Sequence, residues 1–154
     1  MTRQFFATVQ NKMHVAAHGK TAAELVYERA DAKKPNMGLT NFKGNYITSD
    51  DVKVAKNYLS EEELNILNLI VSQYLDFAEL QATRQKAMTM QQWIDKLDEF
   101  LKISDSSVLV GAGKIKHEQA MVKAKREFKK YRDEEMRQLE SDFDKATKEL
   151  RRRG

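Results

Sequence analysis

Apolar residues recur at spacings of three and four along much of the chain, a pattern that is typical of α-helices with one buried face. The first run predicts a helix from Arg3 to Ala17, with an apolar face of Phe5, Phe6, Val9, Met13 and Ala16. Gly19 follows this run. A glycine just after a helix indicates its end, because glycine adopts the left-handed conformation with little strain.

Three motifs mark the starts of further helices. In each, a hydroxyl residue is followed three positions later by Glu or Gln, so that the two side chains can bond free amides of the first helical turn. The motifs are Thr21–Glu24, Ser60–Glu63 and Thr89–Gln92. They predict a helix after Thr21 with Leu25, Val26 and Ala30 on its apolar side, a helix from Ser60 to Thr83, and a helix after Thr89 whose face is Trp93, Ile94, Leu97, Phe100 and Leu101.

The helix expected from Ser60 to Thr83 is apolar over more than one face. Its apolar residues are Leu64, Ile66, Leu67, Leu69, Ile70, Val71, Tyr74, Leu75, Phe77, Ala78 and Leu80. A helix that is apolar around its circumference is usually buried. We therefore predict that this helix is the central element and that neighbours pack on it from several sides.

Residues 31–58 lack a long periodic pattern. The segment 31–49 contains the single proline, two glycines and several asparagines, and it predicts a long loop with a short strand near Tyr46 and Ile47. Long loops in small domains are often functional. The alternative, which we favour, is a packed loop anchored by Met37, Leu39, Phe42 and Tyr46. A short helix from Asp50 to Tyr58 should follow, capped by Ser49 or Thr48.

The last and longest helix is expected from Lys116 to Leu150, after a short helical turn at 108–110 that Gly111 and Gly113 end. Its apolar stripe is Met121, Ala124, Phe128, Tyr131, Leu139, Phe143, Ala146 and Leu150. The spacing fits a straight helix rather than a sustained coiled coil. At 1.5 Å per residue it would be about 50 Å long, so part of it should project or pack on another chain.

Composition agrees with an all-α fold in a single domain over residues 1–154. The chain has 154 residues, with one proline and six glycines. A β fold of this size would need more of these turn-forming residues. We expect about six helices around the central apolar helix, closed by the long C-terminal helix. Cysteine is absent, and no apolar run is long enough to span a membrane, so we expect a cytoplasmic protein without membrane contact.

Positive charge is concentrated at the C-terminal end. Residues 114–154 hold 14 Lys and Arg against 9 Asp and Glu, a net charge of +5, whereas the rest holds 13 and 14, a net charge of −1. The signs alternate along the helix, which favours a solvated face over a nucleic-acid surface. Were nucleic acid to bind, the residues that we expect to contact it are Lys123, Arg126, Lys130, Arg151, Arg152 and Arg153.

Seven polar residues beside the apolar faces form a candidate cluster: His14, His18, Glu24, Arg29, Asp31, Lys56 and Asn57. His14 and His18 are one helical turn apart, which is also the spacing of a metal-binding pair. No zincin pattern accompanies them, so we favour structural contacts over a metal. The seven side chains either converge on a site at the long loop or hold that loop in place by hydrogen bonds, and we favour the second.

Two short glycine motifs resemble parts of nucleotide-binding loops. Gly19-Lys20-Thr21 lacks the earlier glycine of a phosphate loop, because position 14 is a histidine within a predicted helix. Residues 111–114, Gly-Ala-Gly-Lys, lack the preceding strand and the third glycine of a dinucleotide fold. We therefore expect no nucleotide, no other cofactor, no metal and no catalytic residue set.

Several stretches together resemble the C-terminal region of the RhuM virulence-protein family. They are "FFATVQNKMHVAAHGKTAAELVYERAD", "KPNMGLTNFKG", "DVKVAKNYLSEEELNILNLIVSQYLDFAELQA", "MTMQQWIDKLDEFL", "AGKIKHEQA" and "ESDFDK", in this order over nearly the whole chain. The chain departs from the family where "RQKA" precedes "MTM" without Ile-Pro, and in a shorter loop at "FKGNYIT". The resemblance implies no established activity and no catalytic residues. It implies that a DNA-binding-like N-terminal region, similar to phage antirepressor or winged-helix modules, is absent here.

These observations favour a non-catalytic interaction or oligomerisation domain of a bacterial or mobile-element regulatory or defence protein. It would pair with itself or with another protein. One alternative is nucleic-acid binding through the basic C-terminal helix. Another is an enzyme with a site in segments 14–31 and 50–57, which requires the polar side chains named above to converge in one cleft.

Overall fold

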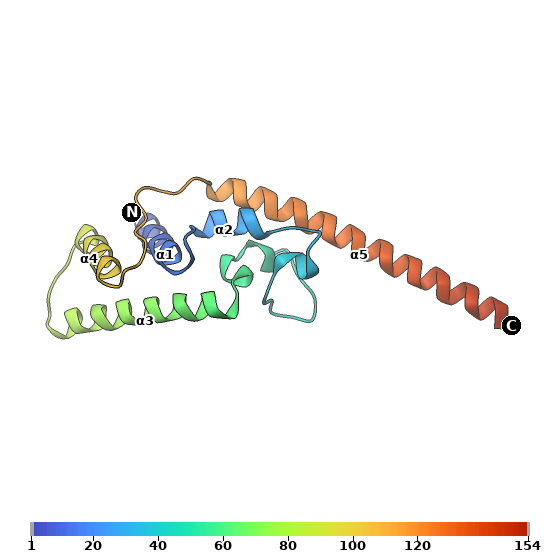
Figure 1. Cartoon of the computed structure of the whole chain (residues 1–154), viewed down its shortest axis with the longest axis horizontal. Helices are drawn as coiled ribbons and strands as arrows, with labels where there is room; N and C mark the ends of the chain where they lie inside the picture. The colour runs from blue at the N-terminus through green and yellow to red at the C-terminus, as the bar shows by residue number, and fades with distance from the viewer. Residues whose placement is uncertain (1, 154) are drawn as a thin grey trace.

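A computed structural model describes residues 2–153, and within this range the molecule is all-α (Figure 1). The α-helices are α1 (Thr2–His18), α2 (Ala22–Arg29), α3 (Glu61–Thr83), α4 (Met90–Ile103) and α5 (His117–Arg153). Three short 3-10 helices lie between α2 and α3: η1 (Pro35–Gly38), η2 (Asp51–Lys53) and η3 (Ala55–Tyr58). The predicted fold class is confirmed, with five α-helices in the described range instead of about six.

The helix starts follow the three capping motifs closely. At α2, the Thr21 hydroxyl accepts from the Glu24 amide at 3.2 Å, and the Glu24 carboxylate accepts from the Thr21 amide at 2.8 Å. Ser60 with Glu63 and Thr89 with Gln92 form the same reciprocal pair at α3 and α4. Each pair satisfies amides that have no partner within the helix, so these three starts could be read from local sequence.

The helices form two groups that meet at α2. The first half of α5 packs along α2, while α1 packs against α3 and α4 (Figure 1). η3 lies on α2, and η2 lies on α5. The side chains of Leu25, Val26, Leu97 and Leu101 are completely buried or nearly so, and Ala120 and Ala124 bring α5 close to α2. The eight-residue α2 is therefore the most enclosed helix.

α3 is not the central element, and that prediction was wrong. It buries one stripe, which consists of Leu67, Ile70, Tyr74 and Gln81. Ile66, Leu69, Leu75 and Leu80 are exposed, and Figure 1 shows α3 at the edge of the molecule. α2 occupies the central position, because α5 covers one side of this short helix and η3 covers another. Hydropathy alone does not distinguish an enclosed helix from an edge helix with unpartnered apolar residues.

The segment expected to be a short helix from Asp50 to Tyr58 is two 3-10 helices instead. Val54 separates them in an extended conformation, with φ −98° and ψ 114°. Side chains occupy carbonyls that an α-helix would use: the Tyr58 hydroxyl donates to the Val52 carbonyl at 2.6 Å, and the Asn57 amide donates to the Asp51 carbonyl at 2.9 Å. The Thr48 hydroxyl accepts from the Asp51 amide at 3.4 Å, but the residue at the N-cap of η2 is Asp50 and not Ser49 or Thr48, and its side chain makes no capping bond.

Residues 31–49 form a packed loop, and no strand occurs near Tyr46 and Ile47 or elsewhere in residues 2–153. Met37, Leu39 and Ile47 are buried, whereas Tyr46 is largely exposed, so Ile47 takes the anchoring role expected of Tyr46. Asn36, Met37 and Gly38 all have positive φ. This tight left-handed stretch brings Gly38 against the carbonyl of Arg29 at the end of α2.

The helical turn expected at 108–110 is absent, and residues 106–110 have no regular secondary structure. The Lys12 ammonium on α1 donates to the Leu109 carbonyl at 2.8 Å and pairs with Asp98 of α4 at 2.9 Å. It ties the segment between α4 and α5 to α1. The Leu109 carbonyl therefore has its hydrogen-bond partner in a distant lysine and not in a local helical turn.

α5 is 37 residues long, which corresponds to about 55 Å. Its first half is packed, but from residue 132 to 153 every side chain except that of Thr147 is exposed. Figure 1 shows this outer half extending away from the other helices to the C-terminus. None of the helices in the described residues is long and apolar enough to cross a membrane.

We predict that Gly38→Ala destabilises the protein more than Gly19→Ala. Both glycines have φ near +85°, so either alanine is strained by about 1 kcal/mol. A Cβ at Gly38 would also overlap the Arg29 carbonyl oxygen, whereas a Cβ at Gly19 would meet no atom within 4 Å. We expect a total loss of about 3 kcal/mol for Gly38→Ala, measured by urea unfolding. Equal losses in the two variants would contradict the observed packing.

Candidate functional site

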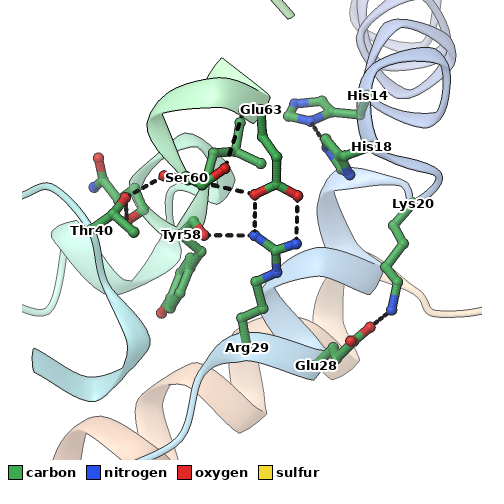
Figure 2. A network of polar contacts seen from close by, with 11 residues as sticks. His14, His18, Lys20, Glu28, Arg29, Thr40, Tyr58, Ser60 and Glu63 are labelled. Carbon is green, nitrogen blue, oxygen red and sulfur yellow. Dashed lines mark hydrogen bonds and ion pairs between the residues drawn. The ribbon is translucent and has the colours of Figure 1, made fainter. Parts of the chain in front are cut away.

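Four of the seven predicted cluster residues lie near one another at the junction of α1, α2, η3 and α3. His14 and His18 come from α1, Arg29 from the end of α2, and Lys56 from η3. Glu63, in the first turn of α3, lies between Arg29 and the two histidines (Figure 2). The centre of this group is thus a carboxylate that sequence analysis had assigned only to a helix cap.

The Arg29 guanidinium and the Glu63 carboxylate form a two-pronged ion pair. The two nitrogen–oxygen distances are 2.6 and 2.7 Å. The same guanidinium donates to the Tyr58 carbonyl at 2.9 Å, and Glu63 also accepts from the Ser60 amide at 2.9 Å (Figure 2). Both side chains are about one quarter exposed. Paired bonds of this kind fix the orientation of both partners, so α2 is locked to the start of α3.

The ion pair changes the acidity of Glu63. Its hydrogen bonds from Arg29 lower the pKa of the Glu63 carboxyl from 4.5 to about 2, against the opposing effect of partial burial. The same interaction raises the pKa of Arg29. Glu63 therefore remains ionised at neutral and mildly acidic pH, and it is suited to hold a cation rather than to transfer a proton.

The two histidines form a neutral pair beside this carboxylate. Nδ1 of His14 and Nε2 of His18 are 2.8 Å apart, so one ring donates and the other accepts. Burial, followed by the nearby His18 and Lys56, lowers the pKa of His14 to about 4. Burial also lowers the pKa of His18, although the charge of Glu63 acts in the opposite direction. The described residues contain no group of three His, Cys, Asp or Glu side chains that could hold a metal ion.

The other three predicted residues make their hydrogen bonds elsewhere and hold segments of the chain together. Glu24 caps α2 and accepts from the Lys114 amide at 3.0 Å, which ties the start of α5 to α2. Asp31 accepts from the Lys33 amide at 2.9 Å within the loop. The Asn57 carbonyl accepts from the Thr40 amide at 2.7 Å. These hydrogen bonds hold the loop and its neighbouring segments in place, and the seven predicted residues do not line one cleft.

His14 and Lys56 also line a groove of about 700 Å³ between α1 and α3. The walls of this groove are mostly apolar and include Phe6, Val9, Val71 and Leu75. Its volume is in the range of small-molecule sites. The polar cluster thus has one side at the partly exposed Arg29–Glu63 pair and one side, at His14 and Lys56, that opens into this groove.

Four of the six cationic residues suggested as nucleic-acid contacts interact within the chain. Lys123 donates to the Tyr27 carbonyl and lies over the Tyr27 ring, 4.9 Å from its centroid. Arg126 and Lys130 both pair with Glu127, and Arg153 pairs with Glu149. Arg151 and Arg152 are exposed in the last turn of α5, where positive charge is favourable at a helix end.

Sequence reasoning missed two long-range pairs. Arg29 with Glu63 and Lys12 with Asp98 each join residues far apart in the chain. Glu63 had a complete local explanation as a capping residue, and Lys12 lies beside the apolar face of α1. A charged residue next to a buried face is the available signal for such a pair, but it does not identify the partner.

Comparison with known proteins gives one family match. The model of the Virulence protein RhuM family matches residues 1–140. No curated protein and no solved structure matches the chain. The match covers α1 to α4 and most of α5.

We predict that Glu63→Gln lowers the stability at neutral pH by about 2 kcal/mol. Gln retains the capping bond to Ser60, so the variant removes mainly the ion pair with Arg29. Because the pKa of Glu63 is lower in the folded state, its contribution should be present above about pH 4.5 and should disappear as the pH falls towards 2. Urea unfolding from pH 7 to 2 measures this difference. Glu62→Gln, at a neighbouring exposed position, is the control, and an equal effect in that variant would contradict the assignment.

We predict that His14 makes the protein less stable as the pH falls from 6.5 to 4. The pKa of His14 is lower in the folded state, so the unfolded chain binds a proton more readily in this interval and unfolding becomes more favourable. The expected loss is about 2 to 3 kcal/mol over the whole interval. His14→Gln should show a flatter dependence on pH in thermal unfolding. Parallel curves for the two proteins would refute the role of His14.

Proposed function

The chain belongs to the RhuM family of virulence proteins, and we propose that within this family it is a non-catalytic assembly module that pairs with a second copy through α5. The observation that carries the proposal is an apolar seam on the outer half of α5, which we define as residues 133–153. The seam consists of Met136, Leu139, Phe143, Ala146 and Leu150. Its four large members are 53, 64, 71 and 70% exposed.

The spacing of this seam fits a paired helix. Its residues are separated alternately by three and four positions, as the a and d positions of a heptad are. The seam covers only about two heptads. It therefore does not require a sustained coiled coil, which the spacing of the whole α5 stripe argues against. A single exposed leucine needs no explanation, but four large apolar side chains on one face of a projecting helix form a surface suited to a partner.

A partner would also stabilise the outer half itself. Most helix stability in proteins comes from packing, and the outer half has almost no packing within one chain. Covering a large apolar side chain contributes about 1.5 to 3 kcal/mol. Pairing therefore stabilises the helix and removes the apolar seam from water at the same time. An unpaired outer half would gain neither contribution.

The charges at the two ends of the outer half favour a second copy in antiparallel orientation. Residues 133–135 are Asp-Glu-Glu, and residues 151–153 are Arg-Arg-Arg. Antiparallel pairing of the two seams places the arginines of each copy beside the carboxylates of the other. Parallel pairing would place like charges together, which is destabilising.

This proposal explains more of the structure than the two alternatives. Most of the cationic residues suggested for nucleic acid already have partners within the chain. The polar cluster is joined by bonds between its own helices, and three of its seven predicted members lie outside it. We further propose, on the family resemblance, that the module serves a DNA-associated regulatory or defence protein of a bacterium or mobile element.

We predict that Leu139→Glu with Phe143→Glu makes the protein monomeric. The wild-type chain should dimerise with increasing concentration between about 1 and 200 μM, a range that matches a short helical seam. Sedimentation equilibrium measures the mass. Ile103→Glu is the matched control, because Ile103 is equally apolar and is exposed at the end of α4. A monomeric wild type at the highest concentration would refute the proposal.

The orientation can be tested in the same sample. In a mixture of unlabelled and ¹⁵N-labelled chains, carbodiimide should join Lys148 of one copy to Glu135 or Glu140 of another copy. Intermolecular links from Lys148 to Glu149 would instead indicate that the two outer halves pair in parallel.

A further inference from the structure

The groove between α1 and α3 has an apolar end and a polar end. Phe5 and Phe6 from the start of α1 and Trp93 from α4 line it together with Leu75 and Ala78 of α3. Gln10, His14 and Lys56 are its polar residues away from this end. From residue 5 to residue 14, α1 rises by about 14 Å, so the groove is elongated along the helix. Phe6 and Leu75 are 57 and 61% exposed, so the apolar end is open to solvent.

Charge is unevenly distributed around this groove. Among the described residues that line it, Lys56 is the one Lys or Arg, and His14 stays neutral because its pKa is lowered to about 4. No carboxylate lies among these lining residues. The Lys56 ammonium lies at the end of a flexible side chain. Its charge is near enough to His14 to contribute to the lowered pKa of that imidazole. The groove therefore presents an elongated apolar surface that ends at a single positive charge.

We propose that this groove binds an amphipathic carboxylate, with its aliphatic chain between α1 and α3 and its anionic head at Lys56. The aliphatic chain would cover the exposed side chains of Phe6 and Leu75 and the partly buried side chain of Val71. The head would accept charge-assisted hydrogen bonds from the Lys56 ammonium. His14 bonds to His18 through Nδ1, so its Nε2 remains the ring nitrogen available at the polar end.

Size and charge together favour this ligand over a neutral or cationic one. A volume of about 700 Å³ suits a small molecule, and such sites are typically apolar with a few polar groups that orient the ligand. A cationic amphiphile would place its head beside Lys56 and be repelled. A neutral one would gain the apolar contacts but not the ion pair. The groove is separate from the outer half of α5, so the inference goes beyond the assembly proposed above.

The chain contains one tryptophan, Trp93, and it lines the groove, so its fluorescence reports on binding. We expect decanoate to cause a saturable spectral shift at micromolar concentrations, 1-decanol to bind more weakly, and decyltrimethylammonium to bind weakest. Lys56→Gln should weaken decanoate binding about tenfold, which is the loss of one ion pair, and leave 1-decanol unchanged. Lys53→Gln, at a lysine outside the groove lining, is the control and should bind decanoate like the wild type.

A second pair of variants tests the apolar wall. Leu75→Glu places a carboxylate in the groove and should abolish decanoate binding, whereas Leu69→Glu changes an equally exposed leucine of α3 that does not line it. Absence of a saturable shift, or equal binding of all three amphiphiles with no effect of Lys56→Gln, would overturn the proposal. The proposal would also be overturned if the wild type did not bind decanoate and Leu75→Glu changed the sedimenting mass. The groove would then be a protein interface. A monomeric wild type that binds decanoate would refute the assembly alone.

Discussion

The contact between Arg29 and Glu63 holds the two parts of this fold in register. α2 has only eight residues and could not keep its orientation by its own hydrogen bonds. Packing against α5 fixes one of its sides, and the guanidinium of Arg29 fixes its end to α3 and to the Tyr58 carbonyl. α1 packs against α3 and α4, and α5 packs along α2, so the placement of α2 relative to α3 also places the other helices. The paired hydrogen bonds at this point therefore set how the long helix leaves the rest of the molecule.

Local chemistry predicted the helices well, and non-local contacts decided the remainder. The capping boxes at Thr21, Ser60 and Thr89 place three helix starts, because hydroxyl, carboxylate and amide groups all lie within one turn. The segment 50–58 was mispredicted because the Val52 carbonyl bonds the Tyr58 hydroxyl, a contact that propensity does not contain. α3 was placed at the centre because its composition is apolar, yet burial depends on which neighbours are available.

The candidate site shows the same division between local and distant information. Sequence reasoning named His14, His18, Arg29 and Lys56, and the fold brings these four near one another. It grouped them with Glu24, Asp31 and Asn57, whose contacts lie along the chain and at its loops. It left out Glu63, because the capping motif already explained that carboxylate. A residue can serve a local cap and a distant ion pair with the two oxygens of one side chain.

The two unpartnered apolar surfaces, on the outer half of α5 and in the groove, lie on different elements and differ in their charged groups, so each favours its own kind of partner. Pairing through α5 is the central claim, and concentration-dependent hydrogen exchange tests it most directly. At about 100 μM, amides of residues 136–150 should exchange slowly, and at about 1 μM they should exchange almost as fast as in an isolated helix, while α4 stays unchanged. Equally fast exchange of residues 136–150 at both concentrations would contradict the account.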